Sequence, residues 1–321
     1  MKTIHCNFCH QQDSTVIARG PDLLLDIAGD FKLVKCKKCG LIYQNPQLSF
    51  EELKKHYPDD YLPYRSEANE SQQSMLDRIS QNHGIQRQCQ RVINKRPSAG
   101  TILDVGCATG YFLKAMAEKG WTAKGVEPSA YASAYAREQL QLDVQTGVLA
   151  DYQSEEKFDV ITLWDVLEHV NDPLETLQQA RQLLKPNGLI VISLPNPSGI
   201  EAALFGNYWV GWERPRHLFL FTPKLIQAYL EKTGYRFLTI ESFNGRLSLT
   251  LLSLEFWLRD KKIPEQRWRP WLKLMYSWPF RIGTWPLYKL LESLNKTSVM
   301  TVFAEGVGLE TAVASPKDAA S

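Results

Sequence analysis

No stretch of this sequence stays apolar over the roughly 18 residues that a membrane-spanning helix needs. The first six residues lack the apolar core of a secretory signal. The sequence also has no large excess of charge of either sign: Lys plus Arg number 37, Asp plus Glu number 35, and the net charge is +2. A balanced charge gives no strong attraction to polyanions. We therefore expect a cytoplasmic protein of enzyme size, and nucleic acid is not an expected partner.

Cysteine is scarce, with six residues in 321, yet four of them are paired at close spacing. Cys6 and Cys9 form one pair, and Cys36 and Cys39 form the other. Close pairs in a cytoplasmic chain are more often metal ligands than disulfides. Two such pairs complete a tetrahedral zinc shell with no open position, so we expect a structural zinc ribbon. The 26 residues between the pairs can form a hairpin or a loop.

From Thr101 onward, short apolar runs alternate with helical stretches, which is typical of a parallel sheet covered by helices. We expect an α/β core over 99–245 and 297–306. The other expected segments are a zinc ribbon over 1–45, a linker and lead-in helix over 46–98, a tryptophan-rich basic helical insertion over 246–296, and a loose tail over 307–321.

An acidic and glycine-rich turn follows the first expected core strand, in the sequence Asp104-Val105-Gly106-Cys107-Ala108-Thr109-Gly110. Open parallel sheets bind ligands at such strand-to-helix turns. Glu127 ends the next strand, where a carboxylate can accept hydrogen bonds from both hydroxyls of a ribose. A nicotinamide site would instead show G-x-G-x-x-G after an apolar strand. The acid before the turn suits a ligand with a positive amino group.

With these residues the chain resembles the class I S-adenosylmethionine-dependent methyltransferases. The stretch 102–112 matches their first motif, Val126-Glu127-Pro128 resembles the second, and 158–170 the third. The resemblance implies a Rossmann-like seven-stranded sheet of order 3-2-1-4-5-7-6. It also implies a site for S-adenosyl-L-methionine formed by Asp104, Gly106, Cys107, Ala108, Gly110, Glu127, Pro128, Val148, Leu149 and Asp165.

Within that implied site, the acidic turn would cradle the methionine part, Glu127 would hold the ribose, and 147–149 would wall the adenine. Two residues depart from the family pattern: Ala108 replaces a common glycine, and Val148 stands where many members have an acid. The replacement by Ala108 is tolerable if this residue keeps a negative φ, as a residue with a Cβ prefers.

The resemblance extends to bacterial methyltransferases that act on the sugars of polysaccharides and natural products. Those proteins share the cysteine ribbon, a tyrosine-rich link that here includes Tyr61 and Tyr64, and a segment like 209–223. The implied acceptor is a small molecule or saccharide, including a nucleotide- or lipid-linked sugar, methylated on oxygen or carbon. A ribosomal-RNA methyltransferase and a non-catalytic S-adenosylmethionine-binding protein are the alternatives.

A sugar hydroxyl has a high pKa, so its methylation needs a base. His217 is the first candidate because its segment follows the fifth strand at the ligand-binding edge, and His169 is the second. His217 could equally be a structural histidine near the Thr222 helix start. Asp165, Glu168 and His169 also resemble the metal site of ubiquinone-pathway O-methyltransferases, with Asp165 shorter than the usual glutamate.

Five of the nine tryptophans lie in 256–296, a segment with nine Lys or Arg and three Asp or Glu. Tryptophan interleaved with basic residues suits a membrane interface. Packing over the sheet or a homodimer contact would also bury these rings. We expect this insertion to form a peripheral contact surface, on the inner face of the membrane or between subunits, rather than part of the catalytic site.

Overall fold

The computed structural model describes residues 1–57, 75–243 and 247–307. The linker tyrosines Tyr61 and Tyr64, and all of the expected tail except Val307, lie outside these residues.

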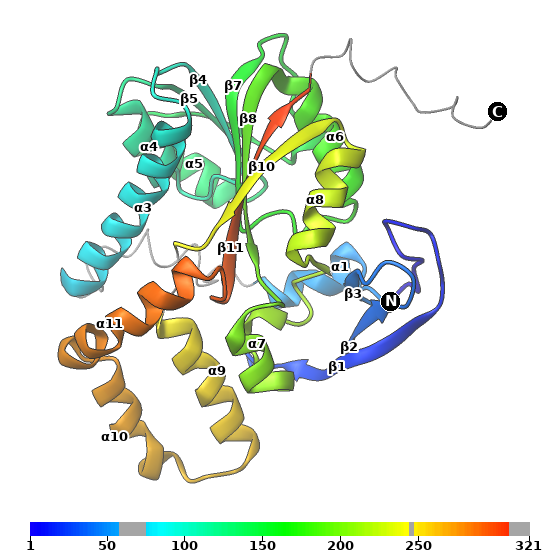
Figure 1. The fold of residues 1–321 in the computed structure, drawn as a ribbon, viewed down its shortest axis with the longest axis vertical. Coiled ribbons are helices and arrows are strands. Elements are labelled where there is room, and N and C mark those ends of the chain that lie inside the picture. Colours follow the sequence, from blue (N-terminus) through cyan, green and yellow to red (C-terminus); the bar gives the residue numbers. More distant parts are fainter. Residues whose placement is uncertain (58–74, 244–246, 308–321) are drawn as a thin grey trace.

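A seven-stranded sheet forms the centre of the molecule (Figure 1). Its order is β6-β5-β4-β7-β8-β11-β10, which is the predicted order 3-2-1-4-5-7-6. The five strands β4 to β8 are parallel to one another, and β11 pairs antiparallel with both β8 and β10 at one edge. The bounds are β4 Thr101–Val105, β5 Thr122–Glu127, β6 Asp143–Thr146, β7 Phe158–Trp164, β8 Leu184–Pro195, β10 Tyr235–Glu241 and β11 Val299–Gly306.

Helices cover both faces of this sheet because its strands carry apolar side chains in both directions. Leu103 and Val105 of β4 pack in one core, whereas Ile102, one position before Leu103, packs in the other. The first core also contains residues of α6 (Pro173–Leu183) and α8 (Pro223–Lys232). The second contains residues of α3 (Met75–Lys95) and α4 (Tyr111–Ala117), and α5 (Ala130–Glu138) packs beside β6.

The N-terminal ribbon is a hairpin of β1 (Ser14–Asp22) and β2 (Ile27–Cys36), followed by β3 (Ile42–Gln44). Its third strand pairs antiparallel with β9 (Phe219–Leu220), which comes from the segment after β8. Tyr43 stands opposite Phe219 in this pairing, and both are fully buried. The ribbon and the α/β core therefore share one four-stranded sheet and one hydrophobic core.

Short elements connect these parts, and helices fill the long connection between β10 and β11. The short elements are α1 Phe50–Leu53, η1 Lys54–His56, η2 Leu149–Asp151, α7 Ile200–Phe205, η3 Gly206–Tyr208 and η4 Val210–Trp212. The insertion contains α9 Leu247–Asp260, α10 Glu265–Met275 and α11 Trp278–Ser293. These three helices project from one end of the molecule (Figure 1), and the predicted helical insertion before the last strand is confirmed.

Candidate active site

The turn after β4 brings the backbone into left-handed conformations at three alternate positions. Gly106 has φ 69°, Ala108 has φ 47° and Gly110 has φ 87°. A side chain at Gly106 would meet Val166 at 2.6 Å, so glycine is required there for the close approach of the segment after β7. Ala108 does not keep the negative φ that its replacement of the common glycine requires. The turn imposes the left-handed region on it, at a cost of about 1–2 kcal/mol.

Glu127 explains why the turn holds this conformation. The Ala108 amide donates to Glu127 Oε2 at 2.9 Å, and the Ser129 amide donates to Oε1 at 2.8 Å. Burial raises the pKa of Glu127, and these two amide bonds oppose the rise. Each carboxylate oxygen keeps acceptor capacity beyond the amide it already binds. The side chain is thus fixed at the end of β5, where it can receive a pair of hydroxyl donors.

Asp104 lies buried at the middle of the sheet, and its Oδ1 accepts from Thr162 Oγ1 at 2.6 Å. Thr162 is its register partner on β7, so the carboxylate faces the space between the two strands. This bond fixes the Asp104 carboxylate against β7, one residue before the end of β4 where the turn begins.

The other predicted cofactor residues divide by exposure. Val148, which follows β6, is 50% exposed, and Pro128, which follows β5, is also exposed. By contrast, Leu149 and Cys107 are buried in hydrophobic cores. Asp165 is exposed with φ 56°, and its Oδ1 accepts from Ser193 Oγ at 2.8 Å.

His169 and His217 meet at the same edge, with ring centroids 4.6 Å apart. His217 Nδ1 lies 2.8 Å from the Gly211 carbonyl oxygen, and His169 Nδ1 lies 3.1 Å from the Arg216 carbonyl oxygen. A carbonyl only accepts, so each Nδ1 carries a proton, and the neutral form of such a ring has its lone pair on Nε2. Burial and the neighbouring His217 lower the pKa of His169 to about 3, so this ring is a weak base.

Glu168 lies beside the two rings and is fully buried. Neither of its carboxylate oxygens has a hydrogen-bond partner among the described residues. Burial, together with Asp165, raises the pKa of Glu168 well above its ordinary value. Potential ligand atoms of Glu168, His169 and His217 lie within 4.8 Å of one another, a group that could hold a metal ion. The sequence resemblance implied a metal site of Asp165, Glu168 and His169, whereas the group in the structure contains His217 instead of Asp165.

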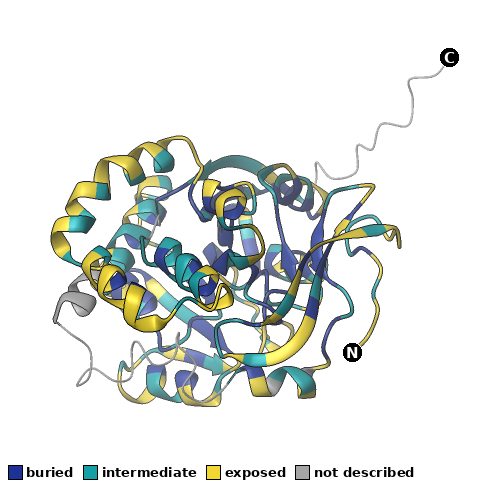
Figure 2. Ribbon diagram, turned by 90° about the horizontal axis from the view of Figure 1, so that it is seen from below, coloured by how far each residue is buried: buried dark blue, intermediate teal, exposed yellow. Residues whose placement is uncertain are grey.

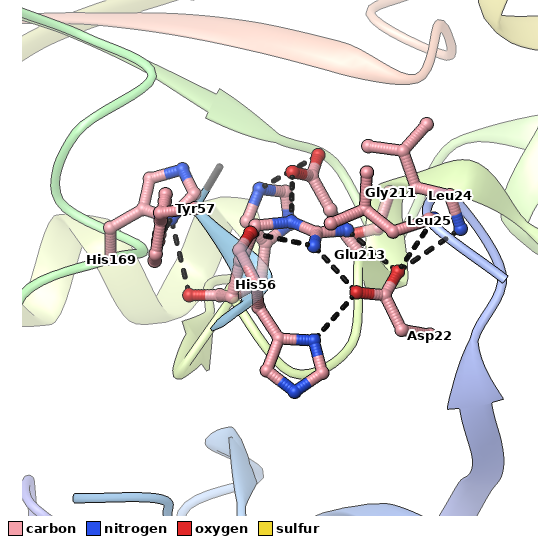
Figure 3. Close-up of polar contacts among 10 residues, drawn as sticks. Asp22, Leu24, Leu25, His56, Tyr57, His169, Gly211 and Glu213 are labelled. Carbon is pink, nitrogen blue, oxygen red and sulfur yellow. Dashed lines mark hydrogen bonds and ion pairs between the residues drawn. The ribbon is translucent and has the colours of Figure 1, made fainter. Parts of the chain in front are cut away.

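A buried ion-pair network ties this edge to the ribbon (Figure 3). Arg216 is fully buried and donates to both Asp22 oxygens, at 2.7 and 2.9 Å. His56 Nδ1 lies 2.8 Å from Asp22 Oδ2, and Arg216 also donates to the His56 carbonyl oxygen at 3.1 Å. Although burial opposes ionisation, the Arg216 guanidinium holds the pKa of Asp22 below its ordinary value. Burial lowers the pKa of His56, which favours the neutral ring.

The network continues to the histidines. Arg216 Nε donates to Glu213 Oε1 at 2.9 Å, and Glu213 Oε2 lies 3.5 Å from His217 Nε2. Tyr57 Oη lies 3.1 Å from His169 Nδ1. Sequence reasoning missed Asp22, His56 and Tyr57, because no motif marks them and their partners lie far away in the chain. The resemblance of segment 209–223 to a family segment is the one sequence feature that points to this network, since the segment contains Arg216.

The four ribbon cysteines converge as their spacing predicts. Cys6 Sγ lies 3.4 Å from Cys39 Sγ, and Cys9 Sγ lies 3.6 Å from Cys36 Sγ. All four sulfurs lie within 4.8 Å of one another. Four thiolates at about 2.3 Å from one tetrahedral zinc would be separated by roughly 3.8 Å. The donor set therefore fits one zinc ion.

Comparison with known proteins places the α/β core in a family. A family described as "Methyltransferase domain" matches residues 78–240, half of the 321 residues. The ubiquinone biosynthesis O-methyltransferase of Histophilus somni is 38% identical over 123 residues, which are 35% of this chain and 50% of that protein. The Actinobacillus pleuropneumoniae serotype 5b protein of the same name is 40% identical over 106 residues, 30% of this chain and 45% of that protein.

The chain spans about half the length of the curated relatives it matches. A solved structure described as a SAM dependent methyltransferase from Archaeoglobus fulgidus is 18% identical, covers 69% of this chain and 94% of that one, and has a TM-score of 0.46. The family match includes the acid–glycine turn, Glu127 and the post-β7 segment. The chain therefore belongs to the methyltransferase-domain family, with the sheet order and turn motif of the class I S-adenosylmethionine-dependent methyltransferases.

Proposed function

We propose that this protein methylates an oxygen of a small-molecule or saccharide acceptor, using S-adenosyl-L-methionine. The observation that carries the proposal is that two well-defined groups of residues lie at the same edge of the sheet. One is the turn after β4, held by Glu127. The other is the pair of histidines whose Nδ1 atoms are committed to carbonyl oxygens. The name of the two curated relatives, ubiquinone biosynthesis O-methyltransferase, supports transfer to oxygen.

S-adenosylmethionine, when bound, supplies an electrophilic methyl group on a sulfonium. Asp104 and the turn glycines would hold its amino-acid part, and Glu127 its ribose. The residues of this chain then have to align the acceptor, exclude water and remove one proton. His217 fits proton removal, since its Nδ1–H is held by Gly211 and its Nε2 lone pair remains available. Glu213, near that Nε2, can stabilise the imidazolium that forms.

A divalent cation is a second way to activate an acceptor hydroxyl at this edge. The unpartnered, buried Glu168 carboxylate supports it, with His169 and His217 as the other ligands. Such an ion would lower the pKa of a bound hydroxyl as a Lewis acid. In that case the two histidines act as ligands rather than as a base.

Mass spectrometry of products from a panel of nucleotide sugars, free sugars and catechol-like phenols tests the proposal. Methylated oxygen in one class, with conversion of the cofactor to S-adenosylhomocysteine, supports it. Loss of turnover after chelation and recovery with Mg²⁺ would favour the cation. Tight cofactor binding with no turnover across the panel, or methylation of nitrogen or of RNA, would contradict O-methylation of a small acceptor.

We also propose that Cys6, Cys9, Cys36 and Cys39 bind one structural zinc ion. Four cysteine ligands leave no open coordination site, so the ion would hold the ribbon together rather than act on the acceptor. The ribbon still contributes to the site, because β3 pairs with β9, which begins two residues after His217.

We expect protein purified without added metal to contain about one zinc per chain. Elemental analysis measures this directly. The Cys6→Ser/Cys36→Ser variant removes one ligand from each pair and should lose the ion. The matched control is Cys89→Ser, because Cys89 is a buried cysteine outside the ribbon. Zinc that stays in the ribbon variant would place the metal elsewhere.

A further inference from the structure

The three inserted helices leave a large apolar surface uncovered. Two of them, α9 and α10, pack on each other through Leu251, Trp268 and Leu272. The third, α11, has no buried residue over its 16 positions. In Figure 2, exposed positions, drawn yellow, alternate with intermediate ones along the helices at the left of the molecule. A helix with this many leucines and tryptophans normally buries one face.

The uncovered residues form what we call the α10–α11 surface. Trp271 is 68% exposed, Ile282 65% and Trp285 60%. Trp278, Ile282 and Trp285 are spaced so that they lie along one side of α11. The full set of large exposed apolar residues on the two helices and just after them is Trp271, Leu274, Tyr276, Trp278, Ile282, Trp285, Leu287, Leu290 and Leu294.

The segment that carries this surface is rich in cations. The segment 256–296 has nine Lys or Arg against three Asp or Glu. Some are paired within the insertion, as Arg259 is with Glu255 and Lys289 with Glu292. Six others have no carboxylate within ion-pair distance among the described residues: Lys261, Lys262, Arg267, Lys273, Arg281 and Lys296. The surface thus offers unpaired positive charge beside exposed indole rings.

We propose that the α10–α11 surface docks on an anionic lipid membrane. Indole rings favour the headgroup level of a bilayer, and nearby Lys and Arg are attracted to anionic headgroups. The core of a protein–protein interface is by contrast depleted in charged residues such as lysine. The contact would be peripheral, since no helix within the described part of the chain is long and apolar enough to cross a membrane.

Vesicle sedimentation of the full chain tests this inference. We expect binding to vesicles of equal parts phosphatidylcholine and phosphatidylglycerol, and little binding to phosphatidylcholine alone. Raising salt from about 0.1 M to about 1 M should release the protein, since the screening length falls from about 10 Å to about 3 Å. The double variant Trp271→Ser/Trp285→Ser should reduce partitioning at least about tenfold. Both rings are exposed, so the thermal melt should be unchanged.

Val16→Ser is the matched control, because Val16 is 54% exposed but lies on the ribbon. It should bind vesicles as the unaltered protein does. Failure to bind anionic vesicles, or binding that the double tryptophan variant retains, would overturn the proposal. So would a dimer in light scattering that dissociates in the double variant while the protein ignores vesicles, since the surface would then be a subunit interface.

Discussion

Replacing His217 by alanine should lower turnover by about 10²–10⁴ while leaving cofactor affinity nearly unchanged. The ring is held by Gly211 through Nδ1, which leaves Nε2 as the proton acceptor. It lies outside the turn after β4 and the Glu127 contacts that form the cofactor end of the site. Steady-state kinetics with the acceptor found in the panel, together with calorimetry for S-adenosylhomocysteine, separates the two effects.

His83→Ala is the control for this variant, because His83 is an exposed histidine on α3. It should leave turnover intact. His169→Ala should have a smaller effect on proton removal, since the low pKa of about 3 makes that ring a weak base. Near-normal turnover in His217→Ala, combined with a large loss in His169→Ala, would contradict the assignment.

Breaking the Asp22–Arg216 pair should destabilise the protein by about 3–5 kcal/mol. Both side chains are fully buried, so Asp22→Ala leaves a guanidinium in the interior without its bidentate partner. It also removes the acceptor of the His56 ring. The variant therefore loosens the ribbon from the segment that carries His217. Urea unfolding followed by tryptophan fluorescence measures the change.

Asp30→Ala provides the comparison, since Asp30 pairs with Arg19 on the same hairpin with both side chains exposed. Exposed pairs contribute only about 0–1 kcal/mol. Equal destabilisation by the two variants would mean that the buried pair does not anchor the ribbon.

Local signals in the sequence predicted much of the fold. Asp172 followed by Pro173, and Thr222 followed by Pro223, are typical helix starts, and the Asp172 and Thr222 side chains each accept a backbone amide as N-caps. The apolar runs predicted the strands, and the family motifs predicted their order. The cysteine spacing predicted sulfurs that converge. In each case the determining residues lie within a few positions of one another or follow a known pattern.

Contacts between distant segments could not be predicted. Asp22 and Arg216 are separated by 194 positions, and neither residue type signals a buried pair when read alone. The two-residue strand β9 exists because β3 is beside it, so its own sequence predicts little. The φ of Ala108 is likewise set by Glu127, which draws in the Ala108 amide from the neighbouring strand end. The part of the site that faces the acceptor depends on such contacts.

Calorimetric titration with S-adenosylhomocysteine is the most direct test of the cofactor site. We expect Glu127→Ala and Asp104→Ala each to weaken binding roughly 100-fold, since charge-assisted hydrogen bonds contribute about 1.5–3 kcal/mol each. Glu127→Gln tests charge at constant size, and Glu138→Ala, an exposed carboxylate on α5, should bind normally. Affinity unchanged in both Glu127→Ala and Asp104→Ala would contradict the assignment of this turn as the cofactor site.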